Sequence, residues 1–168
     1  SMDLYTAIQT RRSIRGYESR PIEQKKLDRI MEAVRLAPSA VNRQPYRFLL
    51  AESETVKESL IEVYAQPWLL EPPLVVVALG NREEAWKRMD GTSAHVIDVS
   101  IAMEHLVLAA ASEGLGTCWI CAFDQRKLAR KLNLAEGWEA VAITPLGYPA
   151  AEPGPRRRKS VAELFERV

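Results

Sequence analysis

The chain has 168 residues, which is enough for a sizeable core, and we predict that residues 1–168 form a single domain. Its hydrophobic share of 47% and charged share of 27% are ordinary for a soluble globular protein, and a net charge of +1 favours neither nucleic acid nor an anionic membrane as a partner. Two cysteines are too few for a disulfide framework, and the first residues lack the apolar core of a signal peptide. We therefore predict a cytoplasmic location.

Two helices are predicted before residue 38. The first is short and covers residues 4–10. The second carries apolar residues at three- and four-residue spacing, which is the pattern of one buried helix face. These residues are Leu27, Ile30, Met31 and Val34. Pro38 follows and ends this helix.

A strand, a helix and a second strand are predicted next. RFLLA, residues 47–51, reads as a strand, and Ser53 is placed to cap the helix that follows. The inward face of that helix consists of Val56, Leu60 and Val63. PLVVVALG, residues 73–80, is a continuous apolar run typical of a strand buried on both faces.

A long helix is predicted over residues 93–113. It is apolar on nearly all sides, so we expect it at the centre of the fold or in a subunit interface. It also contains Asp98, Glu104 and His105, and three ionisable groups in such a run argue against a membrane span.

The last third of the chain predicts two more strands and two helices. TCWIC, residues 117–121, and EAVAITPLGYP, residues 139–149, read as strands. Asp124 is placed to cap a helix between them, and Ser160 with Glu163 forms the pattern of a capping box before a final helix. The chain therefore predicts an α+β fold with about four strands interleaved with helices.

Arginines are concentrated in the segment RRSIR, which contains Arg11, Arg12, Ser13 and Arg15. Guanidinium groups bind phosphates and carbonyls with paired donors. The segment either binds such a ligand or is a solvated helix end whose arginines compensate the helix dipole.

The stretch APSAVNRQPYRF, residues 37–48, places Ser39, Asn42, Arg43 and Gln44 between two prolines. Its neutral side chains offer donors and acceptors that would suit a heterocycle with alternating carbonyls and ring nitrogens. The alternative is a loop whose polar side chains satisfy its own backbone.

Three further patterns carry weaker signals. The run PRRRKS, residues 155–160, is a solvated surface or a weak polyanion patch, and no aromatic residue is interleaved with it as in single-strand binders. His95 and His105 are ten residues apart on one helix and cannot jointly hold one metal ion. The cysteines of CWIC lie in a strand pattern without a second pair, so we interpret Cys118 and Cys121 as structural or pocket-lining residues, and we predict no metal site.

Four segments, taken together and in order, resemble the flavin-dependent nitroreductase family. They are RRSIRGY, APSAVNRQPYRF, LVLAAASEGLGTCWICAFD and RRRKS, and they span residues 5–164. The resemblance implies a nitroreductase-like α+β fold, with a central mixed, mostly antiparallel sheet flanked by helices. It also implies a homodimer with FMN at the subunit interface.

The resemblance also implies which residues bind FMN. Arg11, Arg12, Ser13 and Arg15 would contact the phosphate, the ribityl chain or the pyrimidine edge. Ser39, Asn42 and Gln44 would approach the flavin, with Pro38, Ser39 and Ala40 supplied by the partner subunit. Arg156 and Arg158 would close on the phosphate. Trp119, Ile120, Cys121 and Ala122 would line the ring, with the backbone near Cys121 and Ala122 donating an N–H to the reactive ring nitrogen.

The activity implied is a ping-pong transfer of hydride from NADH or NADPH, through FMN, to a nitroaromatic, a quinone or a similar small acceptor. One departure is the short segment around residues 81–91, where many relatives have a larger helical excursion over the pocket. Trp68, Trp86 and Met89 would replace part of it.

Three other functions stay open at this point. The first is a flavin-binding or flavin-processing protein with little NAD(P)H-dependent turnover. The second is a thiol redox or metal protein built on CWIC, and the third is a nucleic-acid module built on PRRRKS.

Overall fold

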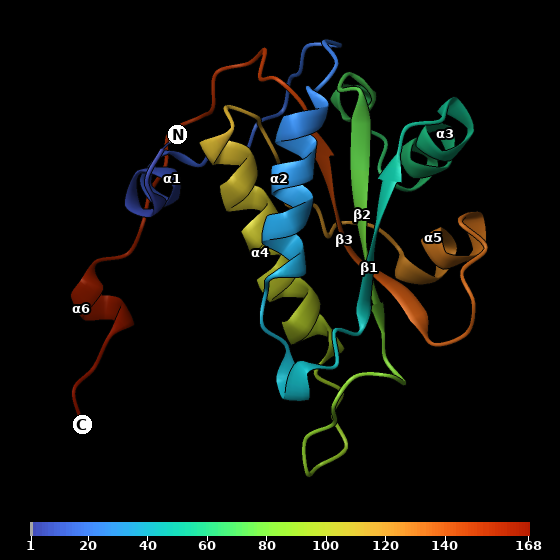
Figure 1. Ribbon diagram of the computed structural model, residues 1–168, viewed down its shortest axis with the longest axis vertical. Coiled ribbons are helices and arrows are strands. Elements are labelled where there is room, and N and C mark those ends of the chain that lie inside the picture. The colour runs from blue at the N-terminus through green and yellow to red at the C-terminus, as the bar shows by residue number, and fades with distance from the viewer. Residues whose placement is uncertain (1) are drawn as a thin grey trace.

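A computed structural model describes residues 2–168. Three strands, β1 (Tyr46–Ala51), β2 (Leu74–Asn81) and β3 (Trp138–Leu146), form one sheet in the order β1-β2-β3, and both pairings are antiparallel. The long helices α2 (Gln24–Arg35) and α4 (His95–Ser112) lie on one face of this sheet, and α3 (Glu54–Val63) and α5 (Gln125–Lys131) lie on the other (Figure 1). The structure is therefore a three-layer α+β arrangement.

The central strand β2 divides the core in two. All of its residues are buried, as the apolar run predicted. Val76 and Ala78 face α2 and α4, whereas Val75 and Val77 face the layer of α3 and α5. Because side chains alternate across a strand, β2 supplies apolar surface to both clusters.

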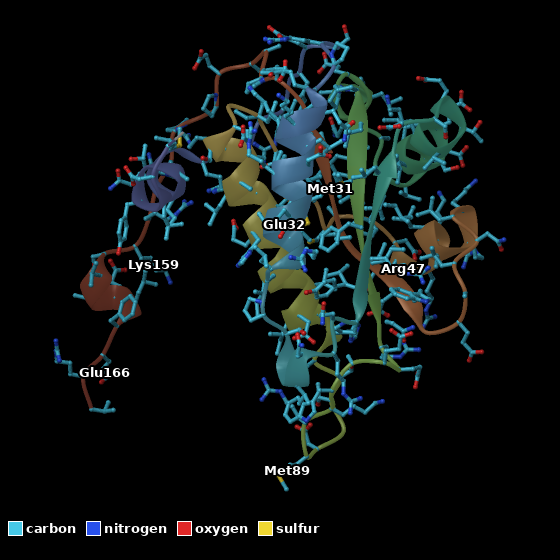
Figure 2. The ribbon with its side chains drawn as sticks, in the orientation of Figure 1. Met31, Glu32, Arg47, Met89, Lys159 and Glu166 are labelled. Atoms are coloured by element: carbon cyan, nitrogen blue, oxygen red, sulfur yellow. The ribbon has the colours of Figure 1, made fainter. Side chains whose placement is uncertain are left out.

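Shorter elements complete the chain. Helix α1 (Leu4–Thr10) packs against α4, and α6 (Val161–Leu164) lies near the C-terminus. Two 3₁₀ turns, η1 (Ala40–Asn42) and η2 (Pro67–Leu70), precede β1 and β2. The tail that carries α6 runs outside the layered body, and the labelled side chains of Lys159 and Glu166 lie on it (Figures 1 and 2).

The predicted helix caps are confirmed. The Ser53 hydroxyl oxygen accepts a hydrogen bond from the Val56 backbone N–H at 3.3 Å. The Asp124 carboxylate accepts from two backbone N–H groups in the first turn of α5. Ser160 and Glu163 form the reciprocal bonds of a capping box. Each cap satisfies backbone donors that the first turn of a helix leaves free.

The predicted strand over TCWIC is wrong. Residues 117–121 form a loop whose backbone pairs with neighbouring segments through isolated bridges, Ser13 to Thr117 and Ile120 to Ile143, and not through a strand ladder. The Cys118 N–H donates to the side-chain hydroxyl of Thr144, at 2.9 Å, instead of to a strand carbonyl. A continuous ladder is therefore interrupted at this point.

The sheet also differs from the expected one in size and type. Within residues 2–168, the sheet has three strands where about four were predicted, and every pairing in it is antiparallel where a mixed sheet was expected. Parallel pairing is represented by the isolated bridge between Ser13 and Thr117. The loss of the strand over residues 117–121 accounts for both differences.

Helix α4 is the core helix of the fold. By length and composition alone it could cross a membrane, a test that buried helices of soluble proteins also pass. Val99, Met103 and Val107 are buried against α2 and the sheet. The opposite side is covered only in part, since Ile97 is 46% exposed and Ile101, Glu104 and Leu108 are partly exposed. On α2, Met31 is also 40% exposed, whereas the apolar spacing predicted an inward position.

Candidate functional site

The arginine segment after α1 is held as an extended strip beside the loop that follows α4. The Ile14 N–H donates to the Thr117 carbonyl at 2.9 Å, and Ser13 forms the bridge to Thr117. Ile14 and Tyr17 are buried, which fixes the backbone and leaves Arg15 exposed between buried positions of the strip. The order of the sequence thus sets which side chains face outward.

The C-terminal segment lies beside this strip, although it is about 145 positions away in the sequence. The Arg156 guanidinium donates to the Arg11 carbonyl at 3.3 Å. Together the two segments enclose a cleft of about 360 Å³, which we call the arginine cleft. Its lining consists of Arg11, Arg12, Ser13, Arg15, Gly154, Pro155, Arg156, Arg157 and Arg158.

Positive charge in the arginine cleft is not neutralised by the protein. Among residues 2–168, none of its six guanidinium groups lies within ion-pair distance of a carboxylate. Like charges in such proximity repel one another unless an anion lies between them. The cleft is therefore suited to a phosphate, which arginine binds with paired donors.

Two other groups border the arginine cleft. Burial raises the pKa of the Glu104 carboxyl on α4, while the Arg11 charge and the Trp119 side chain oppose that rise. Burial also raises the pKa of the Cys118 thiol, and Arg15 opposes it. Burial likewise raises the pKa of Cys121. Raised thiol pKa values are the reverse of what an activated redox dithiol needs, which counts against a thiol function for CWIC.

The second predicted region is the segment of residues 38–45, which we call the connector. Its backbone is unusual, because three of its non-glycine residues have positive φ angles: Val41 at 54°, Asn42 at 54° and Gln44 at 50°. Asparagine adopts this left-handed conformation more readily than most residues, but for the β-branched Val41 it is an outlier. Backbone strain of this kind clusters at functional sites.

Local hydrogen bonds hold the connector in this shape. The Gln44 N–H donates to the Ser39 hydroxyl oxygen at 2.9 Å, and the Gln44 side-chain amide donates to the Asn42 side-chain oxygen at 3.1 Å. Within residues 2–168, the Asn42 NH₂ group and the Gln44 side-chain oxygen make no hydrogen bond. The connector therefore presents a free donor beside a free acceptor.

The connector and the arginine cleft lie at opposite ends of α4 (Figure 1). The Ala40 N–H donates to Asp98 in the first turns of that helix, whereas Ser13 is bridged to Thr117, five residues beyond the last turn. Eighteen helical residues at a rise of 1.5 Å span about 27 Å. One chain therefore does not bring the predicted residues of the connector together with those of the arginine cleft.

The predicted ring-lining loop lies between these two regions. Trp119 is partly buried against the core, and Ile120 is buried and bridged to Ile143. Cys121 and Ala122 are exposed, and their backbone N–H groups make no hydrogen bond to another described residue. This loop thus offers two adjacent free backbone donors at the surface.

Residues 82–93 form a hairpin next to the connector. Lys87 pairs with Ser93, and Gly91, with φ of 88°, makes the turn. Arg43 of the connector donates to the Glu84 carbonyl at 3.3 Å. Met89 is fully exposed at the tip and points away from the body (Figure 2). The segment where many relatives have a larger helical excursion is thus a short hairpin that is hydrogen-bonded to the connector.

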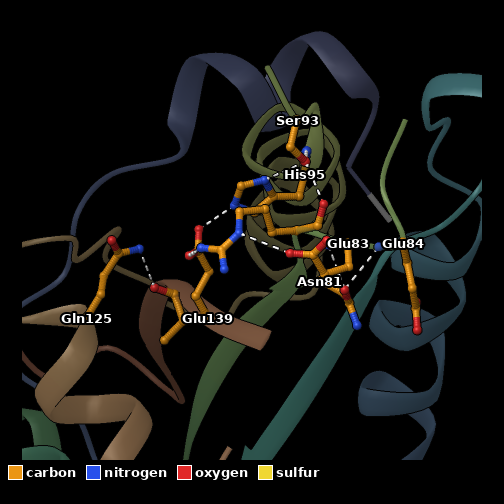
Figure 3. Close-up of polar contacts among 9 residues, drawn as sticks. Asn81, Glu83, Glu84, Ser93, His95, Gln125 and Glu139 are labelled. Carbon is orange, nitrogen blue, oxygen red and sulfur yellow. Dashed lines mark hydrogen bonds and ion pairs between the residues drawn. The ribbon is translucent and has the colours of Figure 1, made fainter. Parts of the chain in front are cut away.

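Both ring nitrogens of His95 contact side chains at the base of this hairpin. Its Nδ1 lies 2.9 Å from the Ser93 hydroxyl, and its Nε2 contacts the Glu139 carboxylate on β3 (Figure 3). Ser93 donates its own proton to the Arg82 carbonyl, so it is not arranged as a nucleophile activated by His95. Within residues 2–168, no cluster of side chains has the composition of a metal site.

The chain matches the family model of the nitroreductases over residues 8–73 and 60–148, which together include the arginine strip, the connector and the loop after α4. The chain belongs to the nitroreductase family. A protein of Methanothermobacter thermautotrophicus, named provisionally as an NADH dehydrogenase/NAD(P)H nitroreductase, is 34% identical over 92% of this chain and 82% of its own length.

Solved structures of nitroreductase-family proteins have the same fold. One from Clostridium novyi is 38% identical, covers 88% of this chain and 86% of its own, and superposes with a TM-score of 0.82. Another from Clostridium difficile 630 is 26% identical, covers 98% of both chains and has a TM-score of 0.90. The resemblance drawn from the four sequence segments is thereby confirmed.

Named activities differ among the more distant relatives of this nitroreductase-family chain. A Bacillus subtilis relative, 27% identical over 88% of this chain and 66% of its own, is named an NAD(P)H-dependent FMN reductase. A Rhodospirillum rubrum relative, 26% identical over 86% of this chain and 81% of its own, is named a 5,6-dimethylbenzimidazole synthase. Family membership therefore indicates an oxidoreductase without fixing the acceptor.

Sequence reasoning missed several residues of this site. Arg157 lines the arginine cleft but was not assigned with Arg156 and Arg158. Asp98 holds the connector through Ala40, yet it was considered only as an argument against a membrane span. The available signal was its position, because a carboxylate inside an apolar helix is buried only when something compensates for it.

Proposed function

We propose that this protein is an FMN-dependent oxidoreductase that transfers hydride from NADH or NADPH to a nitroaromatic, a quinone or a similar small acceptor. The observation that carries the proposal is the arginine cleft, where six unpaired guanidinium groups converge from both ends of the chain. Family membership adds the class of chemistry, since relatives are named as NAD(P)H nitroreductases and an FMN reductase.

The residues present fit the two ends of FMN. The arginine cleft suits the phosphate, with Arg11, Arg12 and Arg156 as donors joined by the Ser13 hydroxyl. The connector suits the pyrimidine edge of the ring, where carbonyl oxygens flank a ring N–H. A free Asn42 NH₂ group can donate to such a carbonyl, and the Gln44 oxygen can accept from the ring nitrogen.

A second copy of the chain is needed to combine these two ends. The arginine cleft and the connector are about the length of α4 apart, which exceeds what a ring and a phosphate joined by a ribityl chain can span. The side of α4 that faces away from the sheet carries Ile97, which is exposed, and Ile101 and Leu108, which are partly exposed. If two α4 helices pack antiparallel through this side, the arginine cleft of one chain lies beside the connector of the other.

Apolar side chains on the tail also support a dimer. Val161, Leu164 and Phe165 are between 59% and 75% exposed, so the tail buries little of its own apolar surface. A second subunit would cover these side chains, together with the outer side of α4.

The chemistry that bound FMN supplies is acceptance of a hydride from the nicotinamide and its donation to the acceptor in a second step. The protein holds the flavin in place and places hydrogen-bond donors around it. The free backbone N–H groups of Cys121 and Ala122 would donate to the ring nitrogen that gains electron density on reduction. This scheme requires no side-chain acid.

The test is a visible absorption spectrum of the purified protein supplemented with FMN and then titrated anaerobically with NADH and with NADPH. Bleaching of bound flavin by either nicotinamide would support the proposal and identify the donor. Bound flavin that stays oxidised with both would contradict the hydride donor, and failure to bind FMN would contradict the site.

Flavin processing is the second candidate function. The segment of residues 82–93 is a small hairpin without a helix, and one relative is named a 5,6-dimethylbenzimidazole synthase. If FMN incubated with the reduced protein under oxygen yields a ring-fragmented product by mass spectrometry, this second function replaces the first.

A further inference from the structure

Asp98 is a buried carboxylate that is only partly paired. It is 1% exposed, and its Oδ1 accepts a hydrogen bond from the Ala40 N–H at 3.0 Å. Within residues 2–168, its Oδ2 has no hydrogen-bond partner, and no cationic side chain pairs with it. Among the described residues, the buried Tyr46 hydroxyl is the other side-chain group without a hydrogen-bond partner. Burial is the main cause that raises the pKa of Tyr46, and the nearby Asp98 carboxylate raises it further.

Such a group is unfavourable for stability. Removing a carboxylate from water without a full set of partners is costly, and the positive end of the α4 dipole offsets this cost only in part. A leucine, which branches at the same carbon as aspartate but is larger, would avoid the cost of a buried carboxylate. The position of Asp98 thus indicates a role outside the stability of the core.

The connector is the segment that Asp98 holds. Val41, Asn42 and Gln44 have left-handed backbones, and such conformations persist only where the surroundings over-determine them. Three contacts tie the connector to the rest of the protein: Ala40 to Asp98, Arg43 to the Glu84 carbonyl, and the Asn81 N–H to the Pro45 carbonyl at 2.8 Å. Asp98 and Asn81 are buried, so these two bonds are the least accessible to competing water, and the Asp98 bond is the one that reaches η1, since Pro45 directly precedes β1.

We propose that Asp98 is a positioning residue for flavin recognition. It anchors the first residue of η1 through a charge-assisted hydrogen bond and so keeps the connector in the strained shape that presents the Asn42 donor and the Gln44 acceptor. This inference rests on the proposed function, because the ligand recognised by the connector is the ring of the flavin. Asp98 itself does not touch that ligand.

The test separates anchoring from general stability by using two substitutions. Asp98→Leu removes the acceptor and the buried charge while filling the volume. We expect its thermal midpoint to be equal to or higher than that of the unsubstituted protein, while its affinity for flavin falls at least ten-fold. Asp98→Asn retains an oxygen for the Ala40 N–H, so we expect its flavin affinity to stay within about three-fold.

Two ligands locate the effect within the site. FMN carries the phosphate and riboflavin lacks it. If Asp98→Leu disturbs the conformation of the connector, the affinities for FMN and for riboflavin should fall by the same factor. The visible absorption bands of the bound ring should also broaden. Ser53→Ala is the matched control. It removes the side-chain cap of α3, on the opposite face of the sheet, and we expect it to lower stability without changing either affinity.

Three results would overturn the inference. One is an Asp98→Leu protein that binds both flavins as tightly as the unsubstituted chain. The second is a loss of flavin affinity that parallels the loss of stability in both Asp98 variants and in Ser53→Ala. The third is an Asp98→Leu protein that fails to fold by circular dichroism, because that would show a structural role for the carboxylate. If the unsubstituted protein binds neither flavin, the proposed function fails instead.

Discussion

On the proposed function, the arginine cleft and the connector would solve two different recognition problems. The cleft is lined by long, mostly exposed cationic side chains from residues 11–15 and from the C-terminal segment beside them. The connector is short, its backbone is strained, and a buried carboxylate anchors it. One region relies on charge and the other on geometry.

The difference follows from the range of the two interactions. Attraction between a guanidinium group and a phosphate falls off slowly with distance, so flexible arginines need not be fixed before the anion arrives. A neutral hydrogen bond weakens steeply once its angle or distance is wrong, so the groups that read a ring edge must be held in place. If the connector binds the flavin ring as proposed, the strained backbone lies where the ligand offers no charge.

The largest expected effect is on the charge-based region. Arg12→Ala removes a charge-assisted bond worth roughly 1.5–3 kcal/mol, so FMN affinity should fall by about 10- to 150-fold. Riboflavin affinity should be unchanged because riboflavin has no phosphate. Fluorescence titration of both ligands measures this, and Arg126→Ala on the opposite layer is the control. Equal losses for both flavins would contradict the assignment of the phosphate to the cleft.

A smaller effect is expected for the geometry-based region. Ser39→Ala removes the acceptor of the Gln44 N–H, a bond of about 1 kcal/mol, and should weaken FMN and riboflavin alike by about five-fold. The same titrations measure this. Ser53→Ala, which removes the cap of α3, should cost a similar stability with no change in either affinity. A loss confined to FMN would place the connector at the phosphate instead.

Strain in the connector can be measured without any ligand. Val41 is 70% exposed with φ of 54°, and asparagine adopts this conformation more readily than valine. Val41→Asn should therefore raise the free energy of unfolding by about 0.5–1 kcal/mol, as measured by denaturant titration. Val63→Asn, at the end of α3 and without a positive φ, should not stabilise the protein. A destabilised Val41→Asn protein would mean that the side chain has packing that outweighs the strain.

The smallest effect concerns Glu104 at the border of the arginine cleft. Burial raises its pKa above the usual 4.5, so the folded state holds this proton more tightly than the unfolded state does. Stability is therefore lost as pH rises from about 4.5 through the raised pKa. Glu104→Gln should remove this pH-dependent loss. Compared with the unsubstituted protein, its free energy of unfolding should be about a few tenths of a kcal/mol more favourable at pH 8 than at pH 4.5. Thermal midpoints at the two pH values test this, and identical pH profiles would contradict it.

Sequence reasoning succeeded where the pattern is local. Helix caps at Ser53, Asp124 and Ser160 depend on residues within three positions, and the buried strand β2 is a continuous apolar run. It failed at residues 117–121, which have the composition of a strand. There the Cys118 N–H donates to the Thr144 side chain and not to the carbonyl of a neighbouring strand. Strand pairing is decided by distant neighbours, which composition does not reveal.

For the site, the sequence identified residue types but not their spatial grouping. The arginines of residues 11–15 and 156–158 were singled out separately, and the family resemblance supplied the reason to join them. The role of Asp98 could not be predicted, because its partner Ala40 is 58 positions away and has no polar side chain. Left-handed φ angles at Val41 and Gln44 were equally invisible, since neither residue type favours them.

Because the arginine cleft is built from both ends of the chain, it is absent for most of the time that a ribosome takes to make the protein. All three strands and helices α1 to α5 are complete by residue 146, ten residues before Arg156. At roughly 5–20 residues per second, Arg156 is synthesised after every strand of the sheet. On the proposed function, a phosphate site that uses Arg156 would therefore form later than the segments that build the layered body.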